Sequence, residues 1–223
     1  FSQGPLLAGA WLECDDSGPR LLLVAHHLVI DGVSWRILLD DLATSVIQIS
    51  QDYGATLPGR GHSFVAWARH LETLAAPDFP DVEKWRHLAG LTPPPLPADH
   101  PDGSNTQVDE WRVTVTLTDE ETRTFLTEAN QAYRTKSEEL LFAACMQGIT
   151  RWQRNENFLV DFERHGREEM ESAPPLSGAI GWFTNMHPVL AVFDWNGDDQ
   201  TAIVAAKEAL RGVPRKGLDF GLL

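Results

Sequence analysis

A proline-rich stretch in the middle of the chain constrains the fold most strongly. Residues 91–105 read "LTPPPLPADHPDGSN" and contain five prolines. Proline lacks a backbone N–H and has a fixed φ, so this stretch cannot be a helix and favours an extended, exposed connector. We therefore predict a first lobe over residues 1–90, a connector over 91–107 and a second lobe over 108–223.

Patterns typical of strands and helices alternate on both sides of the connector. In the first lobe, "RLLLVA" predicts a short buried strand, and an apolar stripe with helical spacing follows from Ser34, which is the candidate N-cap. In the second, Thr118 and Glu121 form a capping-box pattern for a helix to about residue 133. The full set of predicted strands covers 20–25, 110–117, 157–163 and 187–193, and the further helices cover 63–76, 80–89, 137–153 and 199–211. This alternation predicts a mixed α/β (α+β) class.

Composition excludes several classes of partner. The 223 residues carry a formal charge of −14, which disfavours nucleic acid and anionic membranes. Cys14 and Cys145 lie in unrelated contexts, which indicates a reducing compartment, and neither a long apolar stretch nor a secretory leader is visible. We expect a cytoplasmic protein. Because the first and last residues do not resemble natural ends, we also expect a portion of a longer chain.

Two adjacent histidines end the first predicted strand, in "AHHLVIDGVSW". Side chains of strand neighbours point to opposite faces, so one of His26 and His27 can face a cavity while the other packs inside. The plain alternative is that both are core or edge histidines. Asp31 can hold a ring tautomer or an arginine, and Gly32 leaves room for a ligand. A neutral imidazole here suits proton transfer.

A charged cluster, "DFERHGREE", follows the predicted strand at 157–163. Glu163 stands at the strand end, although a solvated charged loop is the alternative. Glu163 and His165 suggest metal ligands, but no third ligand follows at a familiar spacing, so we predict no metal site. Arg167 is expected to pair with an acidic neighbour or with Asp31.

A third stretch, "GAIGWFTNMHPV", places a small residue before two large rings. Gly181, Trp182 and Phe183 either plug the core before a strand or form a narrow apolar channel wall.

Together these stretches resemble the epimerization domains of nonribosomal peptide synthetases, within the condensation-domain superfamily. "HHLVIDGVSW" resembles the H-H-x-x-x-D-G motif, and "DGVSWRILL" is similar to its epimerization variant. "ERHGRE" resembles E-G-H-G-R-E, with Arg164 in place of the glycine, and "AIGWFT" resembles T-V-G-W-F-T. "RGVPRKGLDFGLL" is similar to the stretch that follows in that family.

The resemblance implies a fold similar to chloramphenicol acetyltransferase, with two lobes forming a V around a central tunnel. This chain would be an incomplete portion of it, about half of such a domain. The resemblance places His27 in the cleft with His26 packed behind it, and makes Asp31, Gly32 and Arg167 supporting residues. Residues expected to line the tunnel are Trp35, Gly181, Trp182 and Phe183.

The implied activity is inversion at the Cα of an aminoacyl or peptidyl thioester. The substrate would be tethered to the phosphopantetheine arm of a peptidyl carrier protein, beside neighbouring synthetase domains of an antibiotic pathway, and the domain itself would bind no cofactor. His27 and Glu163 would exchange the roles of acid and base. Peptide-bond-forming condensation and non-catalytic docking of carrier proteins are the alternatives.

Overall fold

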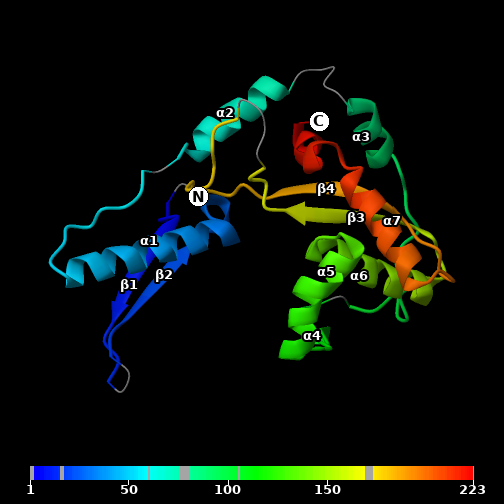
Figure 1. Ribbon diagram of the computed structural model, residues 1–223, viewed down its shortest axis with the longest axis horizontal. Helices are drawn as coiled ribbons and strands as arrows, with labels where there is room; N and C mark the ends of the chain where they lie inside the picture. The colour runs from blue at the N-terminus through cyan, green and yellow to red at the C-terminus, as the bar shows by residue number, and fades with distance from the viewer. Residues whose placement is uncertain are drawn as a thin grey trace. The chain divides into compact units, whose positions relative to one another are not determined.

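The computed structural model describes residues 3–15, 18–59, 61–75, 81–104, 106–168 and 173–222. Its elements group into two compact units that interleave along the sequence (Figure 1). Unit 1 comprises Phe1–Pro80, Glu163–Met186 and Leu218–Leu223, and unit 2 comprises Asp81–Phe162 and His187–Gly217. Residues 92–100 are exposed and have no helix or strand, as expected of a connector. The lobe division at this connector stays a prediction.

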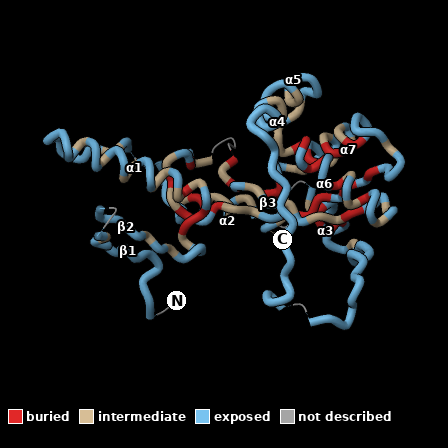
Figure 2. Tube along the Cα trace, turned by 90° about the horizontal axis from the view of Figure 1, so that it is seen from below, coloured by how far each residue is buried: buried red, intermediate tan, exposed pale blue. Residues whose placement is uncertain are grey.

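A two-stranded hairpin opens unit 1. Strand β1 (Leu7–Leu12) pairs antiparallel with β2 (Arg20–Ala25), so that Leu7 lies opposite Ala25. The sequence predicted β2 but not β1. The predicted burial of β2 was wrong, since Leu22 and Val24 are 49% and 57% exposed. A two-stranded sheet covers neither of its faces unless another layer packs on it, and Figure 2 shows the hairpin largely in the colour of exposed residues.

Helices complete unit 1, and residues outside helices and strands provide most of its core. A single 3₁₀ turn, η1 (His27–Val29), leads into α1 (Gly32–Ser50). The helix predicted over 63–76 is α2 (Phe64–Leu74), which is capped by Ser63. The N-cap of α1 is Asp31 and not Ser34, because the Asp31 carboxylate accepts the backbone N–H of Ser34. The buried core of this unit consists of Trp67, Leu176, Ala179, Phe183 and Leu218.

Unit 2 combines the remaining helices with most of a second strand pair. Strands β3 (Asn157–Arg164) and β4 (Asn185–Val192) are neighbours, and both were predicted within two residues of their ends. The helices are α3 (Val82–Ala89), α6 (Ser137–Gln153) and α7 (Asp199–Arg211), with the short turn η2 (Gln107–Asp109). The segment η4 (Pro214–Leu222) begins in unit 2 and belongs to unit 1 from Leu218 onward. Buried segments gather on α3, α6 and α7 in Figure 2. The ring of Phe142 contacts those of Phe162 and Phe193 at the centre of this core.

The predicted helix after Thr118 is present, with a short change of winding. It runs through α4 (Asp119–Thr124), the π-helical turn η3 (Phe125–Ala129) and α5 (Asn130–Tyr133). The capping box is confirmed, because Thr118 and Glu121 each accept the other's backbone N–H.

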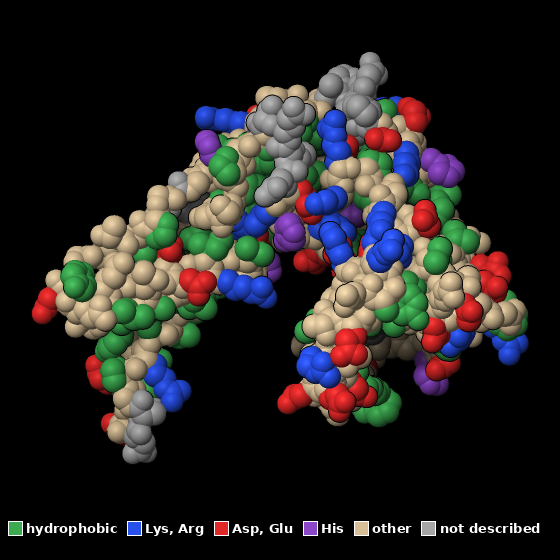
Figure 3. All heavy atoms as spheres, viewed as in Figure 1, with side chains coloured by type: hydrophobic (Ala, Val, Ile, Leu, Met, Phe, Trp, Pro, Cys, Tyr) green, Lys and Arg blue, Asp and Glu red, His purple; other side chains and the backbone are tan. Residues whose placement is uncertain are grey.

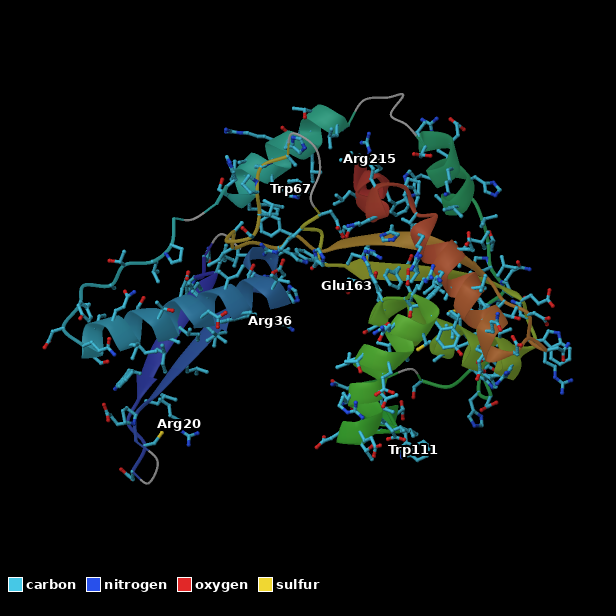
Figure 4. The ribbon with its side chains drawn as sticks, in the orientation of Figure 1. Arg20, Arg36, Trp67, Trp111, Glu163 and Arg215 are labelled. Carbon is cyan, nitrogen blue, oxygen red and sulfur yellow. The ribbon has the colours of Figure 1, made fainter. Side chains whose placement is uncertain are left out.

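The predicted strand at 110–117 was wrong. These residues form no strand, and Trp111, Val113 and Val115 are 87%, 70% and 88% exposed. Alternation sets the side-chain pattern of a strand, but a strand also needs a neighbour to complete its hydrogen bonds, and none pairs with this segment among the described residues. Figure 4 labels Trp111 in this segment.

Candidate active site

The loop between β2 and α1 places the two histidines differently from the prediction. Because β2 ends at Ala25, His26 and His27 do not lie on opposite faces of a strand. His26 is exposed rather than packed behind its neighbour, and its Nδ1 accepts the backbone N–H of Leu28 at 3.1 Å, which caps the 3₁₀ turn. The prediction of a packed His26 was therefore wrong.

His27 is exposed and lies against the third motif. Its imidazole is 5.6 Å from the ring of Trp182, centroid to centroid, at an interplanar angle of 58°. The structure thus brings together two sequence motifs that are far apart along the chain. Trp182 itself is 40% exposed, so both rings reach solvent.

Asp31 is a buried carboxylate that connects three segments. Its Oδ1 accepts the backbone N–H of Ser34 at 2.7 Å, and its Oδ2 accepts that of Phe183 at 3.1 Å. Arg167 Nη2 lies 3.1 Å from Oδ1, so the predicted pairing of these two residues is confirmed. Burial alone would raise the pKa of Asp31, but these backbone hydrogen bonds and the arginine charge outweigh it and hold that pKa below its ordinary value.

Arg167 completes this network from the other side. Its Nη1 donates to the carbonyls of Leu176 and Ala179 at 3.0 and 2.7 Å, while its guanidinium lies 4.1 Å from the ring centroid of Phe183. Only 7% of the side chain is exposed. A planar group with several fixed donors suits this role, because it can satisfy two carbonyls and a carboxylate at once. Arg167 therefore holds the third motif onto the start of α1.

Ser34 is a site residue that the sequence analysis named only as a cap. Its side chain is fully buried. The hydroxyl donates to the Gly181 carbonyl at 2.9 Å and accepts from the Gly181 N–H at 3.1 Å and from Arg167 Nη2 at 2.7 Å. Its position directly after the Asp-Gly-Val of the motif is the signal in the sequence that could have indicated this role.

An open pocket of about 280 Å³ lies where these segments meet in unit 1. It brings Glu163, at the end of β3, beside Asp31 and Gly32 of the histidine motif. Figure 4 labels Glu163 and Arg36, an exposed residue in the second turn of α1. The complete lining is Asp31, Gly32, Val33, Arg36, Glu163, Arg164, His165 and Thr184. Of these, the residues that the sequence did not indicate as site residues are Val33, Arg36, Arg164, His165 and Thr184.

Other predicted site residues lie outside this pocket. His27 is not part of its lining, so the expectation that it faces Glu163 stays a prediction. Phe183 belongs to the buried core, and Gly181 lies against Phe64, since an added Cβ would approach that side chain to 3.0 Å. The lining of a tunnel by Trp35, Gly181, Trp182 and Phe183 likewise stays a prediction.

Glu168 is the last residue of the second motif, and its carboxylate is buried. Its Oε1 is 3.6 Å from Arg164 Nη1 and 3.8 Å from His165 Nε2. The Arg167 backbone N–H donates to His165 Nδ1 at 2.9 Å. These contacts fold the segment after Glu163 back on itself.

Within the described ranges, no group of three or more His, Cys, Asp or Glu side chains is arranged to hold a metal ion.

Gly166 permits this folding, and its replacement tests it. Its φ is +64°, and an added Cβ would overlap the Phe183 carbonyl oxygen. We expect Gly166→Ala to destabilise the site by more than the ~1–3 kcal/mol typical of backbone strain alone. Hydrogen–deuterium exchange of peptides covering 163–168 and 178–186 measures the loss. Gly148→Ala is the control, because Gly148 lies within α6 and has open space around an added Cβ. This substitution should be neutral or stabilising. Equal protection in both variants would contradict this.

Acid should loosen the same network. Because the pKa of Asp31 is lowered in the folded state, its contribution to stability is complete above the ordinary value of 3.8 and is lost as the pH falls through the lowered pKa. We expect peptides from the start of α1 to lose exchange protection below about pH 4, and Asp31→Asn to reduce this pH dependence. An unchanged acid dependence in the variant would show that other groups cause it.

The fold and this site belong to a known family. The family model described as "Condensation domain" matches residues 1–223. The chain therefore belongs to the condensation-domain family, of the kind found in nonribosomal peptide synthetases. Among the described residues, no helix is both long and apolar enough to cross a bilayer.

Curated relatives match over nearly the whole chain. It is 41% identical over 207 residues to a linear gramicidin synthase protein of Brevibacillus parabrevis, covering 92% of this chain and 4% of that protein. It is 36% identical over 225 residues to a mycosubtilin synthase protein of Bacillus subtilis, covering all of this chain and 9% of that protein. The chain thus spans a small part of the relatives that it matches.

Solved structures confirm the predicted fold type. The epimerization domain from the third module of tyrocidine synthetase B matches with a TM-score of 0.87 and 32% identity, over 99% of this chain and 51% of that one. The first condensation domain of the calcium-dependent antibiotic synthetase matches with a TM-score of 0.72 and 18% identity, over 98% and 51%. The chain spans about half the length of both. The fold is the mixed, chloramphenicol-acetyltransferase-like one expected, while the V-shaped arrangement and its tunnel stay predictions.

Proposed function

We propose that this chain contributes to an epimerization domain, which inverts the Cα of an aminoacyl or peptidyl thioester. The substrate is carried on the phosphopantetheine arm of a carrier protein, and the domain needs no cofactor or metal of its own. A thioester acidifies the adjacent Cα–H, so inversion requires a base on one face and an acid on the other. His27 and Glu163 are the groups proposed for these roles.

One observation carries the proposal. Glu163 is exposed in an open pocket that it shares with the Asp-Gly pair of the histidine motif. An accessible carboxylate beside the Asp-Gly pair can exchange protons with a bound substrate. Such a position fits this role better than it fits a structural one. Asp31, by contrast, is committed to Arg167 and to backbone N–H groups, so it is a positioning group and not a base.

The likeness to a solved epimerization domain supports the same choice. That match has a TM-score of 0.87 and 32% identity, against 0.72 and 18% for the solved condensation domain. The lower identity speaks only for a shared fold. Condensation remains the second candidate, because the family model that matches the whole chain is named for it.

A single assay separates the two functions. The complete protein that carries this chain is supplied with a carrier loaded with an L-aminoacyl or L-peptidyl thioester in D₂O. Epimerization gives a mixture of D and L product with deuterium at Cα, without any new amide bond. Condensation gives an amide only when a second, amine-bearing carrier is present, and leaves the Cα hydrogen in place.

The outcomes decide between three functions. Deuterium at Cα with inversion supports the epimerase. Amide formation without Cα exchange rejects it in favour of condensation. Binding of the carrier with neither reaction rejects both in favour of a docking domain.

A further inference from the structure

The start of α1 holds the backbone on both sides of Trp182. On one side, the Ser34 hydroxyl binds both the N–H and the carbonyl of Gly181. On the other, Asp31 Oδ2 accepts the N–H of Phe183 at 3.1 Å. Trp182 therefore has little freedom in its backbone, although its side chain is 40% exposed.

The ring held in this way is the one that lies against His27. The two ring centroids are 5.6 Å apart. His27 is exposed and sits in a single 3₁₀ turn, so few other contacts orient its imidazole. The path from Ser34 through Gly181 and Trp182 to His27 lies entirely within unit 1.

We infer that Ser34 is a positioning residue for His27, acting through the Gly181–Trp182 backbone. This inference rests on the proposed function, since it assigns Ser34 a part in that reaction. A serine hydroxyl suits the role because it donates and accepts at the same time. Alanine can make neither bond to Gly181, and a larger polar side chain would need extra room at this fully buried position.

Loss of the hydroxyl affects the two proton-transfer groups unequally. Gly181 loses both of its bonds to Ser34. Arg167, which follows Glu163 in the second motif, loses one bond but keeps Asp31 and the carbonyls of Leu176 and Ala179. The effect therefore falls on the His27 side of the reaction. A small displacement of a catalytic group costs up to about 10²-fold in rate.

The test measures Cα–H exchange with solvent separately for the L and D thioesters, in the complete protein. We expect Ser34→Ala to lower exchange of one isomer by about 10–100-fold and to shift the ratio of the two in the same direction as His27→Ala. A smaller folded fraction would lower both isomers equally and leave the ratio unchanged. Ser45→Ala is the matched control, because among the described residues that hydroxyl bonds only the Asp41 carbonyl of the same helix.

A double variant tests the path. If Ser34 acts through Trp182, then Ser34→Ala with Trp182→Leu is no slower than the slower single variant, whereas independent effects multiply. Should Ser34→Ala not fold, Ser34→Cys offers similar volume with a weakly bonding sulfur. An unchanged isomer ratio, or multiplying losses, would overturn the inference. Absence of exchange in the unmodified protein would instead reject the proposed function.

Discussion

On the proposed function, we expect replacement of Glu163 by Gln to lower the rate of Cα inversion by about 10²–10⁴-fold, and replacement of His27 by Ala to do the same. This is the range that general acid–base groups contribute to a proton-transfer step. Inversion needs a proton removed from one face and another delivered to the opposite face, so either loss alone is enough to slow it. Chiral analysis of the thioester product, released from the carrier, measures the rate.

A second glutamate, at the other end of β3, provides the control for Glu163. Glu156 precedes β3 and lies outside the pocket lining. Glu156→Gln removes the same charge in the same way, and we expect it to invert the substrate at the normal rate. Normal inversion by both Glu163→Gln and His27→Ala would contradict the assignment of the two catalytic residues.

Replacing Arg167 by Met destabilises unit 1 by about 3–5 kcal/mol, as expected when one partner of a buried ion pair is removed. Asp31 is only 3% exposed, so its carboxylate would lose the charge that compensates its burial. The carbonyls of Leu176 and Ala179 would also lose their donor. Loss of exchange protection in peptides covering 31–50 and 173–186 measures this effect.

A second ion pair in the protein provides a comparison for this loss of stability. Arg211 binds Glu139 at 2.6 Å, and that carboxylate is as buried as Asp31, with 3% of its side chain exposed; the arginine side chain, however, is 52% exposed, so water can replace part of what it provides. Arg211→Met should therefore loosen unit 2 less than Arg167→Met loosens unit 1. Asp31→Asn combined with Arg167→Met should recover part of the loss, because the buried charge is then gone. Equal effects of the two arginine substitutions would contradict the role of burial.

Local signals in the sequence predicted most elements well. The capping pattern at Thr118, the helical stripes of α2, α6 and α7 and the run before Asp31 all depend on residues close together in the chain. Burial could not be predicted in this way. β2 has the composition of a buried strand and is exposed, and residues 110–117 have the alternation of a strand without a partner among the described residues. Both depend on which segments pack on them.

The sequence indicated which residues form the site better than it indicated how they are arranged. The Asp31–Arg167 pair was one of the two pairings expected for Arg167, whose charged cluster also offered acidic neighbours. The role of Ser34 was not, since its three bonds reach Gly181 and Arg167 across more than 130 positions in sequence. On the face that Figure 3 shows, basic and acidic side chains both occur, so net charge alone could not locate the site.

Exchange of the Cα hydrogen with solvent, measured separately from inversion, tests the central claim most directly. Each single variant is given the L and the D thioester separately in D₂O, and loss of the Cα hydrogen is followed by mass spectrometry. If His27 and Glu163 serve opposite faces, each variant keeps exchange of one isomer and loses that of the other, and the retained isomers are opposite in the two variants. Loss of the same isomer in both variants would contradict the account.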